Sequence, residues 1–200
     1  MATKRIMSPE GRLRFIAAFE GKLNFNGDGK EKSVVVLIPK TASVKQLTDA
    51  WTACAQEEFI GKIPGGLRKI LGGQKPVLKD GDEIYATKDE DKQDMYKEYQ
   101  GCWVFQPACE ERFKLTIRNA DNTDIFDPAE LYDGCYGRAF ISLEVFSSKK
   151  WGAQCKVKLL GIQKTRDGEA LGGGTTTPMS DDEANKFFGG GVQTEDLDNL

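Results

Sequence analysis

Basic and aromatic side chains share one face of several predicted strands in the second half of this chain. Residues 112–119, 136–146 and 153–164 alternate with a period of two, as strands with one buried face do. Lysine and arginine neutralise phosphates, and aromatic rings stack on unpaired bases for about 1–3 kcal/mol each. This mixture favours the binding of a single-stranded nucleic acid. The candidates are Trp103, Phe105, Lys114, Arg118, Tyr136, Arg138, Phe140, Lys156 and Lys158.

The same pattern has a simpler explanation. Lysine and arginine on the outer face of an antiparallel sheet are what exposure to solvent alone produces. Phe140 and Phe146 could equally form a dimer interface or lie under a helix. The alternation by itself therefore leaves both explanations open. The apolar sets on the opposite faces are predicted to be core residues: Phe113, Leu115 and Ile117; Ala139, Ile141, Leu143 and Val145; Ala153, Cys155, Val157 and Leu159.

The residue types give little support to catalysis. The chain has no histidine, which excludes serine–histidine and cysteine–histidine catalysis and most transition-metal sites. Its five cysteines are widely spaced and form no C-x-x-C pair, so we predict free thiols. No glycine-rich segment has the spacing of a nucleotide-binding loop. We expect a protein that is not an enzyme and that needs neither a cofactor nor a metal.

The elements that must position these side chains are mostly strands. Strands are predicted at residues 13–19, 33–39, 101–105, 112–119, 136–146 and 153–164, with residues 33–39 buried on both faces because nearly all are apolar. One helix is predicted at residues 43–59, with Ser43 as its cap, Gln46 at the capping-box position and Trp51 in the core. Residues 61–82 and 89–94 are predicted to be loops.

The acidic charge of the chain is concentrated at its end. Residues 180–200 hold six acidic side chains and one lysine, so the 28 basic and 31 acidic residues of the chain leave 27 and 25 for residues 1–179. With so few apolar residues, this segment is expected to be disordered. Spaced hydrophobic residues in an acidic end segment favour a recruitment peptide over a merely solubilising tail. The residues expected to contact a partner are Phe187, Phe188, Glu195, Asp196, Asp198 and Leu200.

Several segments, in this order, resemble a known family over residues 12–174. They include "RLRF" (12–15), "VVVLIPK" (34–40), "KDGDE" (79–83) and "YQGCWVF" (99–105). The strongest are "DPAELYDGCYGRAFISLEVF" (127–146) and "GIQKTRDGEALGGG" (161–174). The chain thus resembles small bacteriophage single-stranded DNA-binding proteins. The resemblance implies a mainly β fold: a five-stranded Greek-key oligonucleotide/oligosaccharide-binding (OB) barrel with one packed helix, long loops and a disordered acidic tail. The expected division is a DNA-binding domain at residues 1–172 and a flexible tail at 173–200.

The resemblance also implies a mechanism and partners. Single-stranded DNA is expected to lie across the basic and aromatic strand faces, with Lys62, Arg68 and Lys69 on a loop at the rim of the groove. The tail is expected to compete with DNA for the groove and to recruit a phage DNA polymerase or helicase during replication or recombination. A homodimer is also open, no membrane contact is expected, and the location would be the cytoplasm of the infected bacterium.

A different class of function remains as an alternative. A non-enzymatic phage interaction or inhibitory protein could use the same β scaffold, with the acidic tail occupying the basic cleft of a host or phage partner. Absence of salt-dependent binding to oligonucleotides would favour that alternative.

Overall fold

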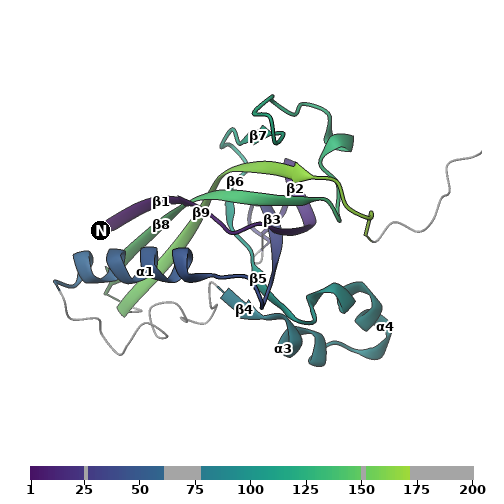
Figure 1. Ribbon diagram of the computed structural model, residues 1–200. Helices are drawn as coiled ribbons and strands as arrows, with labels where there is room; N and C mark the ends of the chain where they lie inside the picture. Colours follow the sequence, from purple (N-terminus) through teal and green to yellow (C-terminus); the bar gives the residue numbers. More distant parts are fainter. Residues whose placement is uncertain (25–26, 61–77, 150–151, 172–200) are drawn as a thin grey trace, which may run out of the picture.

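The strands of the computed structural model belong to one nine-stranded sheet, in the part of the chain that it describes: residues 1–24, 27–60, 78–149 and 152–171 (Figure 1). This confirms the predicted mainly β fold. The strands are β1 (Ala2–Met7), β2 (Gly11–Leu23), β3 (Lys30–Pro39), β4 (Leu78–Asp80), β5 (Cys102–Phe105), β6 (Ala108–Glu110), β7 (Thr116–Arg118), β8 (Tyr136–Ser148) and β9 (Gly152–Arg166).

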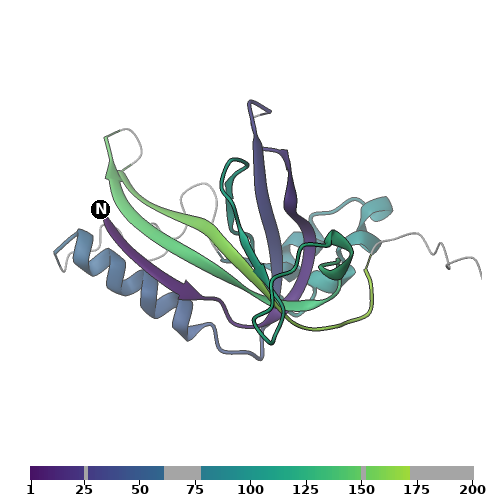
Figure 2. The ribbon, with the colours of Figure 1, turned by 90° about the horizontal axis from the view of Figure 1, so that it is seen from above.

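Five of these strands pair in a closed ring. Strand β8 pairs with β2, β2 with β3, β3 with β6, β6 with β9, and β9 again with β8. The β6–β9 contact is parallel, whereas the other four are antiparallel. The other four described strands add to this ring, so the described sheet has more strands than the expected five. Figure 2 shows the β2–β3 and β8–β9 hairpins extending from the ring with β6 between them.

Strand β8 supplies the centre of the main core. Ala139, Ile141, Leu143 and Val145 are all fully buried, as their alternation predicts. On β9, Leu159 is fully buried, while Ala153, Cys155 and Val157 are partly buried against the same core. The five cysteines are free, as predicted.

Strand β3 is buried on both faces, as its apolar run predicts. Val34, Val36 and Ile38 belong to the main core, whereas Val35 and Leu37 face a second, smaller one. The second core also contains Tyr99, from the segment that follows β4, and Val104, from strand β5.

The helix α1 (Lys45–Glu58) lies along β1 and β8 (Figures 1 and 2). Trp51 is 1% exposed in the main core, which confirms its predicted place. The helix begins later than expected: Val44 is at the N-cap position and no side chain caps it. Ser43 instead accepts a hydrogen bond from the backbone N–H of Lys45 (3.3 Å). None of the helices in the described residues is long and apolar enough to cross a membrane.

The loops predicted at residues 61–82 and 89–94 are wrong in part, because residues 78–99 form a strand and short helices. After β4, the chain forms the short helices α3 (Gly81–Ala86) and α4 (Glu90–Gln93) and the 3-10 helix η1 (Asp94–Tyr99); another, η2, spans Pro128–Glu130. Asp80 caps α3 by accepting a hydrogen bond from the N–H of Asp82 (2.9 Å). A side chain at Gly81 would place its Cβ 2.0 Å from the carbonyl oxygen of Tyr99, so glycine allows α3 and η1 to pack closely. The remainder of the predicted loop, residues 61–77, lies outside the described residues.

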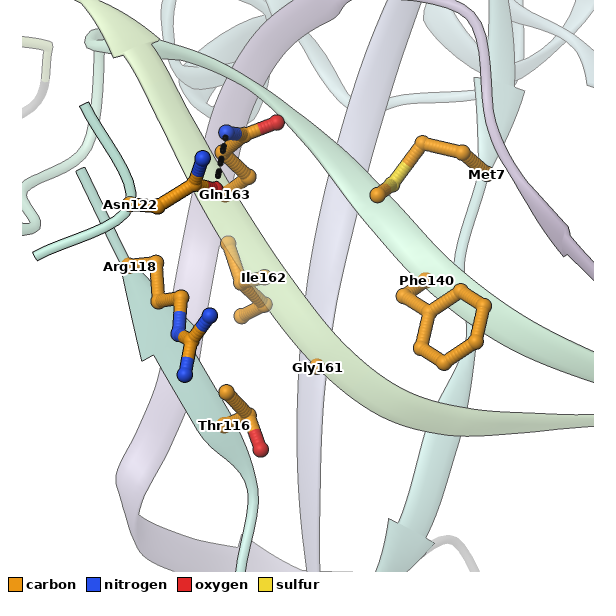
Figure 3. A pocket seen from close by; sticks show the side chains of 8 residues that line it. All are labelled: Met7, Thr116, Arg118, Asn122, Phe140, Gly161, Ile162 and Gln163. Carbon is orange, nitrogen blue, oxygen red and sulfur yellow. Dashed lines mark hydrogen bonds between the residues drawn. The ribbon is translucent and has the colours of Figure 1, made fainter. Parts of the chain in front are cut away.

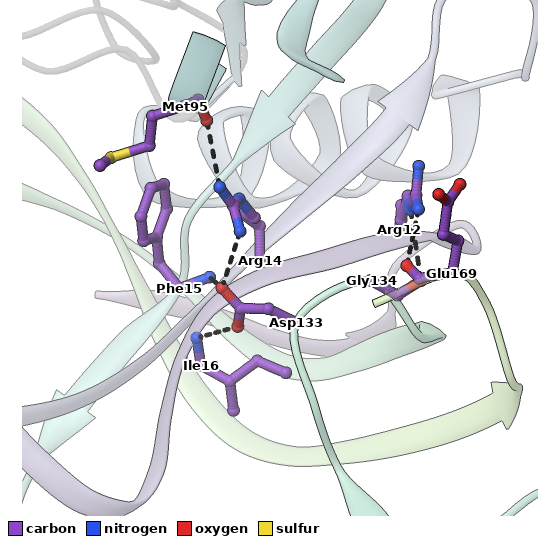
Figure 4. A network of polar contacts seen from close by, with 8 residues as sticks. All are labelled: Arg12, Arg14, Phe15, Ile16, Met95, Asp133, Gly134 and Glu169. Atoms are coloured by element: carbon purple, nitrogen blue, oxygen red, sulfur yellow. Dashed lines mark hydrogen bonds and ion pairs between the residues drawn. The ribbon is translucent and has the colours of Figure 1, made fainter. Parts of the chain in front are cut away.

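An ion pair between a buried arginine and a half-buried aspartate stabilises a bulge in β2 (Figure 4). Arg14 is 4% exposed, and its Nη1 lies 3.3 Å from Oδ2 of Asp133. The same carboxylate accepts hydrogen bonds from the N–H groups of Phe15 (2.9 Å) and Ile16 (3.1 Å). Phe15 has a φ of 47°, a left-handed conformation that is unusual for a non-glycine residue. Asp133 therefore holds a strained turn of the chain in place.

Replacing Asp133 by alanine is expected to lower the free energy of unfolding by about 3–5 kcal/mol, because Arg14 would be left as a buried charge without its partner. Urea denaturation measures this loss. The matched control is Asp91→Ala on the exposed side of α4, which should change stability by no more than about 0.5 kcal/mol. Equal stability losses in the two variants would contradict the role assigned to the ion pair.

Candidate nucleic-acid interface

Outward residues of four neighbouring strands lie in two cross-strand rows. In the first row, Phe140 of β8 pairs with Met7 of β1 and with Gly161 of β9, and Gly161 pairs with Thr116 of β7. In the second row, Gln163 of β9 lies between Arg138 of β8 and Arg118 of β7. Residues far apart in the sequence are thereby brought onto one surface.

A first hollow opens on this surface (Figure 3). Gly161 is essential to its shape, because a Cβ there would lie 2.7 Å from the carbonyl oxygen of Thr116. With no side chain on Gly161, the ring of Phe140 has an open space beside it and is 36% exposed. The polar side of the hollow carries Arg118, Asn122 and Gln163, the last donating from Nε2 to Oδ1 of Asn122 (3.4 Å).

A second hollow lies across β7 and shares Thr116 and Arg118 with the first. Lys32 and Lys114 line it beside Phe126, which is 80% exposed. An aromatic ring with so large an exposed surface, next to two lysines, suits stacking on a base.

A third hollow lies between the β2–β3 hairpin and β9. Lys30, Lys156 and Lys158 line it together with Phe113, and the ammonium of Lys158 is 3.3 Å from the centre of the Phe113 ring. Lys32 connects this hollow to the second, because its ammonium donates to the carbonyl oxygen of Phe113 (3.1 Å).

The three hollows and Arg138 together are called the basic strip here. Six cationic side chains line the hollows, against three carboxylates, so the lining has a positive balance. Lys114, Arg138 and Lys156 form no ion pair with any described residue, whereas Arg118 is paired with Asp124 (3.0 Å). The cations are Lys30, Lys32, Lys114, Arg118, Lys156 and Lys158, and the carboxylates are Glu31, Glu110 and Asp124.

Two predicted aromatic residues lie elsewhere. Trp103 is half-buried against the main core on β5, and the ammonium of Lys40 lies 5.3 Å from its ring. Hydrogen bonds to Asp80 and Asp82 raise the pKa of this lysine above its usual range. Tyr136 is at the start of β8, where the guanidinium of Arg166 covers one face of its ring at 3.3 Å.

Phe105 is wrongly predicted to offer a stacking surface. Its side chain is 0% exposed and lies in the main core, on the face of β5 opposite Val104. The alternation of residues 102–105 is as predicted, but both faces of this strand are covered, one by the main core and the other by the second core.

Replacing Phe105 by alanine is expected to cost about 3–5 kcal/mol of stability, because it leaves a cavity in the main core. Thermal unfolding monitored by circular dichroism measures this cost. Oligonucleotide affinity at a temperature where the variant is fully folded should be unchanged. If the variant lost oligonucleotide affinity but kept its stability, Phe105 would contact DNA and this prediction would be wrong.

The inward prediction for Phe113 is also wrong. Residues 112–119 are not one strand: β7 begins only at Thr116, and residues 111–113 form a turn. Phe113 therefore lies at the surface and is 36% exposed, while Leu115 and Ile117 are buried as predicted. Lys62, Arg68 and Lys69, together with Phe187, Phe188, Glu195, Asp196, Asp198 and Leu200, lie outside the described residues.

Sequence reasoning missed several side chains of the basic strip. Phe126 lies in a polar loop, where an isolated aromatic residue among aspartates was the available signal. Lys30 and Lys32 begin β3, just before its apolar run. Asn122 and Gln163 had no signal, because only the parallel pairing of β7 with β9 brings them together.

A family model for the single-stranded DNA-binding protein of Enterobacter phage Enc34 matches residues 4–195. This match confirms the family resemblance found in the sequence. No match was found among curated proteins.

Solved structures of phage proteins have a similar fold. The Enc34 single-stranded DNA-binding protein in complex with single-stranded DNA has a TM-score of 0.62 at 19% identity, over 84% of this chain and 89% of that one. A C-terminal truncation of the Enc34 protein has a TM-score of 0.61 at 20% sequence identity; the match covers 84% of this chain and 88% of that one. For gp2.5, a single-stranded DNA-binding protein encoded by bacteriophage T7, the TM-score is 0.53 and the sequence identity 14%; the match covers 100% of this chain and 99% of that one.

Proposed function

This chain belongs to the family of the single-stranded DNA-binding protein of Enterobacter phage Enc34, and from that premise we propose that it binds single-stranded DNA along the basic strip. Binding is sequence-tolerant, because the strip offers charges for phosphates and ring faces for any base. The observation that carries the proposal is the alternation of open aromatic rings, Phe140 and Phe126, with two cations, Lys114 and Arg138, that form no ion pair with a described residue.

The ring of five paired strands supports an OB barrel as the scaffold of this function. OB folds are five-stranded barrels that bind single strands on the face of their second and third strands and with the loops after the first and fourth strands. Here the β2–β3 and β8–β9 hairpins stand on either side of the third hollow. We assign residues 1–172 to this domain, with Lys62, Arg68 and Lys69 on a rim of the groove.

Residues 173–200 form the second part of the proposal. Their negative charge competes with DNA for the basic strip, and DNA binding releases the segment for a replication partner such as a phage DNA polymerase or helicase. Phe187, Phe188, Glu195, Asp196, Asp198 and Leu200 contact that partner. The protein thereby protects single strands during phage replication or recombination in the host cytoplasm.

The test is a titration of a labelled oligo-dT followed by fluorescence anisotropy at several salt concentrations. Each neutralised phosphate contributes a slope of about −0.7 to the log–log salt dependence, so the seven cations of the strip predict a slope of about −5. Unlabelled duplex DNA of the same length should fail to displace the labelled oligo-dT. Binding that is absent at low salt, or that does not depend on salt, would overturn the proposed function.

A further inference from the structure

The first hollow of the basic strip offers hydrogen-bonding groups as well as a stacking surface (Figure 3). The ring of Phe140 lies on one side of Gly161. The side chains on the other side are Arg118, Asn122 and Gln163. Stacking does not distinguish one base from another, because every base has a π-face, whereas hydrogen bonds to base edges do. The polar side of this hollow can therefore add selectivity to a strip that is otherwise sequence-tolerant.

One backbone carbonyl fixes the direction of the Gln163 amide. Its Nε2 donates to the carbonyl oxygen of Asn119 (3.4 Å) and to Oδ1 of Asn122 (3.4 Å). A carbonyl oxygen can only accept, so the amide cannot be turned over without losing the first of these bonds. Oε1 of Gln163 is then an acceptor to which no described residue donates. For the same reason, Nδ2 of Asn122 is a donor with no acceptor among the described residues.

Arg118 adds a second donor, and an ion pair fixes its position. Its Nε donates to Oδ1 of Asp124 (3.0 Å), and the two residues also form an isolated β-bridge. No described residue accepts a hydrogen bond from Nη1 or Nη2 of Arg118. One of these nitrogens can donate to a phosphate while the other donates to a base. The hollow thus presents two donor side chains and one acceptor.

The turn that carries Asn122 is ordered before any ligand binds. The N–H of Asn119 donates to the carbonyl oxygen of Thr123 (2.9 Å), and the N–H of Asn122 donates to that of Asn119 (3.1 Å). The carboxylate of Asp121 accepts a further bond from the N–H of Thr123 (3.0 Å). Asn122 has a φ of 68°, a left-handed conformation that asparagine adopts more readily than most residues. Because these groups are already in place, little ordering entropy opposes binding.

Only pyrimidine bases match two donors and one acceptor on a single edge. On the Watson–Crick edge, thymine offers the acceptors O2 and O4 with the donor N3–H, and cytosine offers O2 and N3 with its amino group. Adenine offers one acceptor beside its amino group. Guanine offers one acceptor with two donors or, on its Hoogsteen edge, two acceptors without a donor. A purine therefore leaves at least one of the three side chains unpaired, which is costly once DNA has displaced water from it.

The size of the hollow favours the same class of base. Its volume is about 210 Å³, whereas pockets for drug-sized ligands measure about 300–1,000 Å³. Met7 of β1 and Thr116 of β7 limit it at the two ends of the first cross-strand row. A single six-membered ring fits such a space better than the fused rings of a purine.

We propose that the first hollow selects a pyrimidine base. The base lies against the ring of Phe140, and its donor faces Oε1 of Gln163. Its two acceptors face Arg118 and Asn122. This inference rests on the proposed function and deepens it: charges and rings along the strip accept any sequence, while one position prefers thymine or cytosine.

The test is the competition of unlabelled oligo-dT, oligo-dC and oligo-dA of equal length against labelled oligo-dT, measured by anisotropy on the full chain. The quantity of interest is the ratio of the affinities for oligo-dT and oligo-dA. Gln163→Met keeps the length of the side chain without its amide, and Asn122→Gly keeps the left-handed backbone without a side chain. In each variant the ratio should fall at least about fivefold, because oligo-dT loses a contact that oligo-dA does not make. Stacking of adenines within free oligo-dA contributes the same factor for every variant, so it cancels.

A matched control removes an amide elsewhere. Gln100 is exposed and does not line the basic strip, so Gln100→Ala should leave the ratio unchanged. Thermal midpoints show that each variant is folded. The salt slope for oligo-dT should be the same in Gln163→Met as in the wild type, because no phosphate contact is lost.

The three oligomers separate base selection from a structural role. Weaker binding of oligo-dT and oligo-dC, with little change for oligo-dA, supports the selection of pyrimidines. An unchanged ratio, even with weaker binding of all three, would mean that Gln163 and Asn122 only hold the turn, and it overturns the inference while the proposed function stands. Oligo-dC that binds as weakly as oligo-dA and does not respond to the two variants also overturns it. If oligo-dT itself does not bind, the proposed function fails and the inference fails with it.

Discussion

Replacing Lys114, Arg138 and Lys156 together by glutamate is expected to weaken oligo-dT binding by at least about 100-fold at moderate salt. Each change removes a phosphate contact and introduces repulsion, and a loss of about 1 kcal/mol per site already multiplies to this factor. The log–log salt slope should become shallower by about 2, because three contacts of about 0.7 each are lost. All three side chains are exposed and form no ion pair with a described residue, so the fold should be unaffected.

The matched control changes three other exposed lysines by the same amount of charge. Lys45 on α1, Lys92 on α4 and Lys97 on η1 do not line the basic strip. Their replacement by glutamate lowers the net charge equally, so it should slow association. The salt slope should change by less than the value of about 0.7 that one phosphate contact contributes. If both triple variants weaken binding alike, overall charge rather than the strip governs affinity.

Hydrophobic alternation predicted the long strands well because burial on one face determined their side-chain pattern. In β8, Ala139, Ile141, Leu143 and Val145 are buried, and Arg138 and Phe140 are exposed, as the period of two requires. The apolar run of β3 correctly indicated two covered faces. In each case the pattern spans enough residues to be unambiguous.

The failures come from short elements, where local context outweighs the pattern. Residues 112–119 alternate, yet a turn precedes β7 and carries Phe113 to the surface. Residues 78–99 are polar and contain glycine, yet the cap at Asp80 and the close packing at Gly81 allow α3 to form. Phe105 was misplaced because alternation gives the two faces of a strand but does not show whether the outer one is covered.

The candidate site could be predicted in its residue types but not in its assembly. Arg118, Arg138 and Phe140 were found from sequence, and the structure brings them together around β9. Their proximity depends on the parallel pairing of β7 with β9 and on a register shift between Phe140 and Ile141, neither of which has a sequence signature. Phe126 joins them from a loop.

Replacing Phe140 by alanine is expected to weaken oligo-dT binding by about 5- to 150-fold, because one stacked base contributes about 1–3 kcal/mol. The salt slope should stay the same, since no phosphate contact is lost. This combination separates stacking from charge: the glutamate variant changes both affinity and slope, whereas Phe140→Ala changes affinity alone. Anisotropy titrations of the two variants over the same salt series measure both quantities.

Conservative and distant substitutions control for indirect effects of Phe140→Ala. Phe140→Tyr keeps a ring beside Gly161 and should restore most of the affinity. Met95→Ala removes an exposed apolar side chain outside the strip and should leave affinity unchanged, because the bond from Arg14 reaches only its backbone carbonyl. If Phe140→Ala binds as well as the wild type while Phe126→Ala does not, the bases stack at the second hollow instead. The strand would then cross β7 on the side of Lys114, since Phe126 shares that hollow with this lysine.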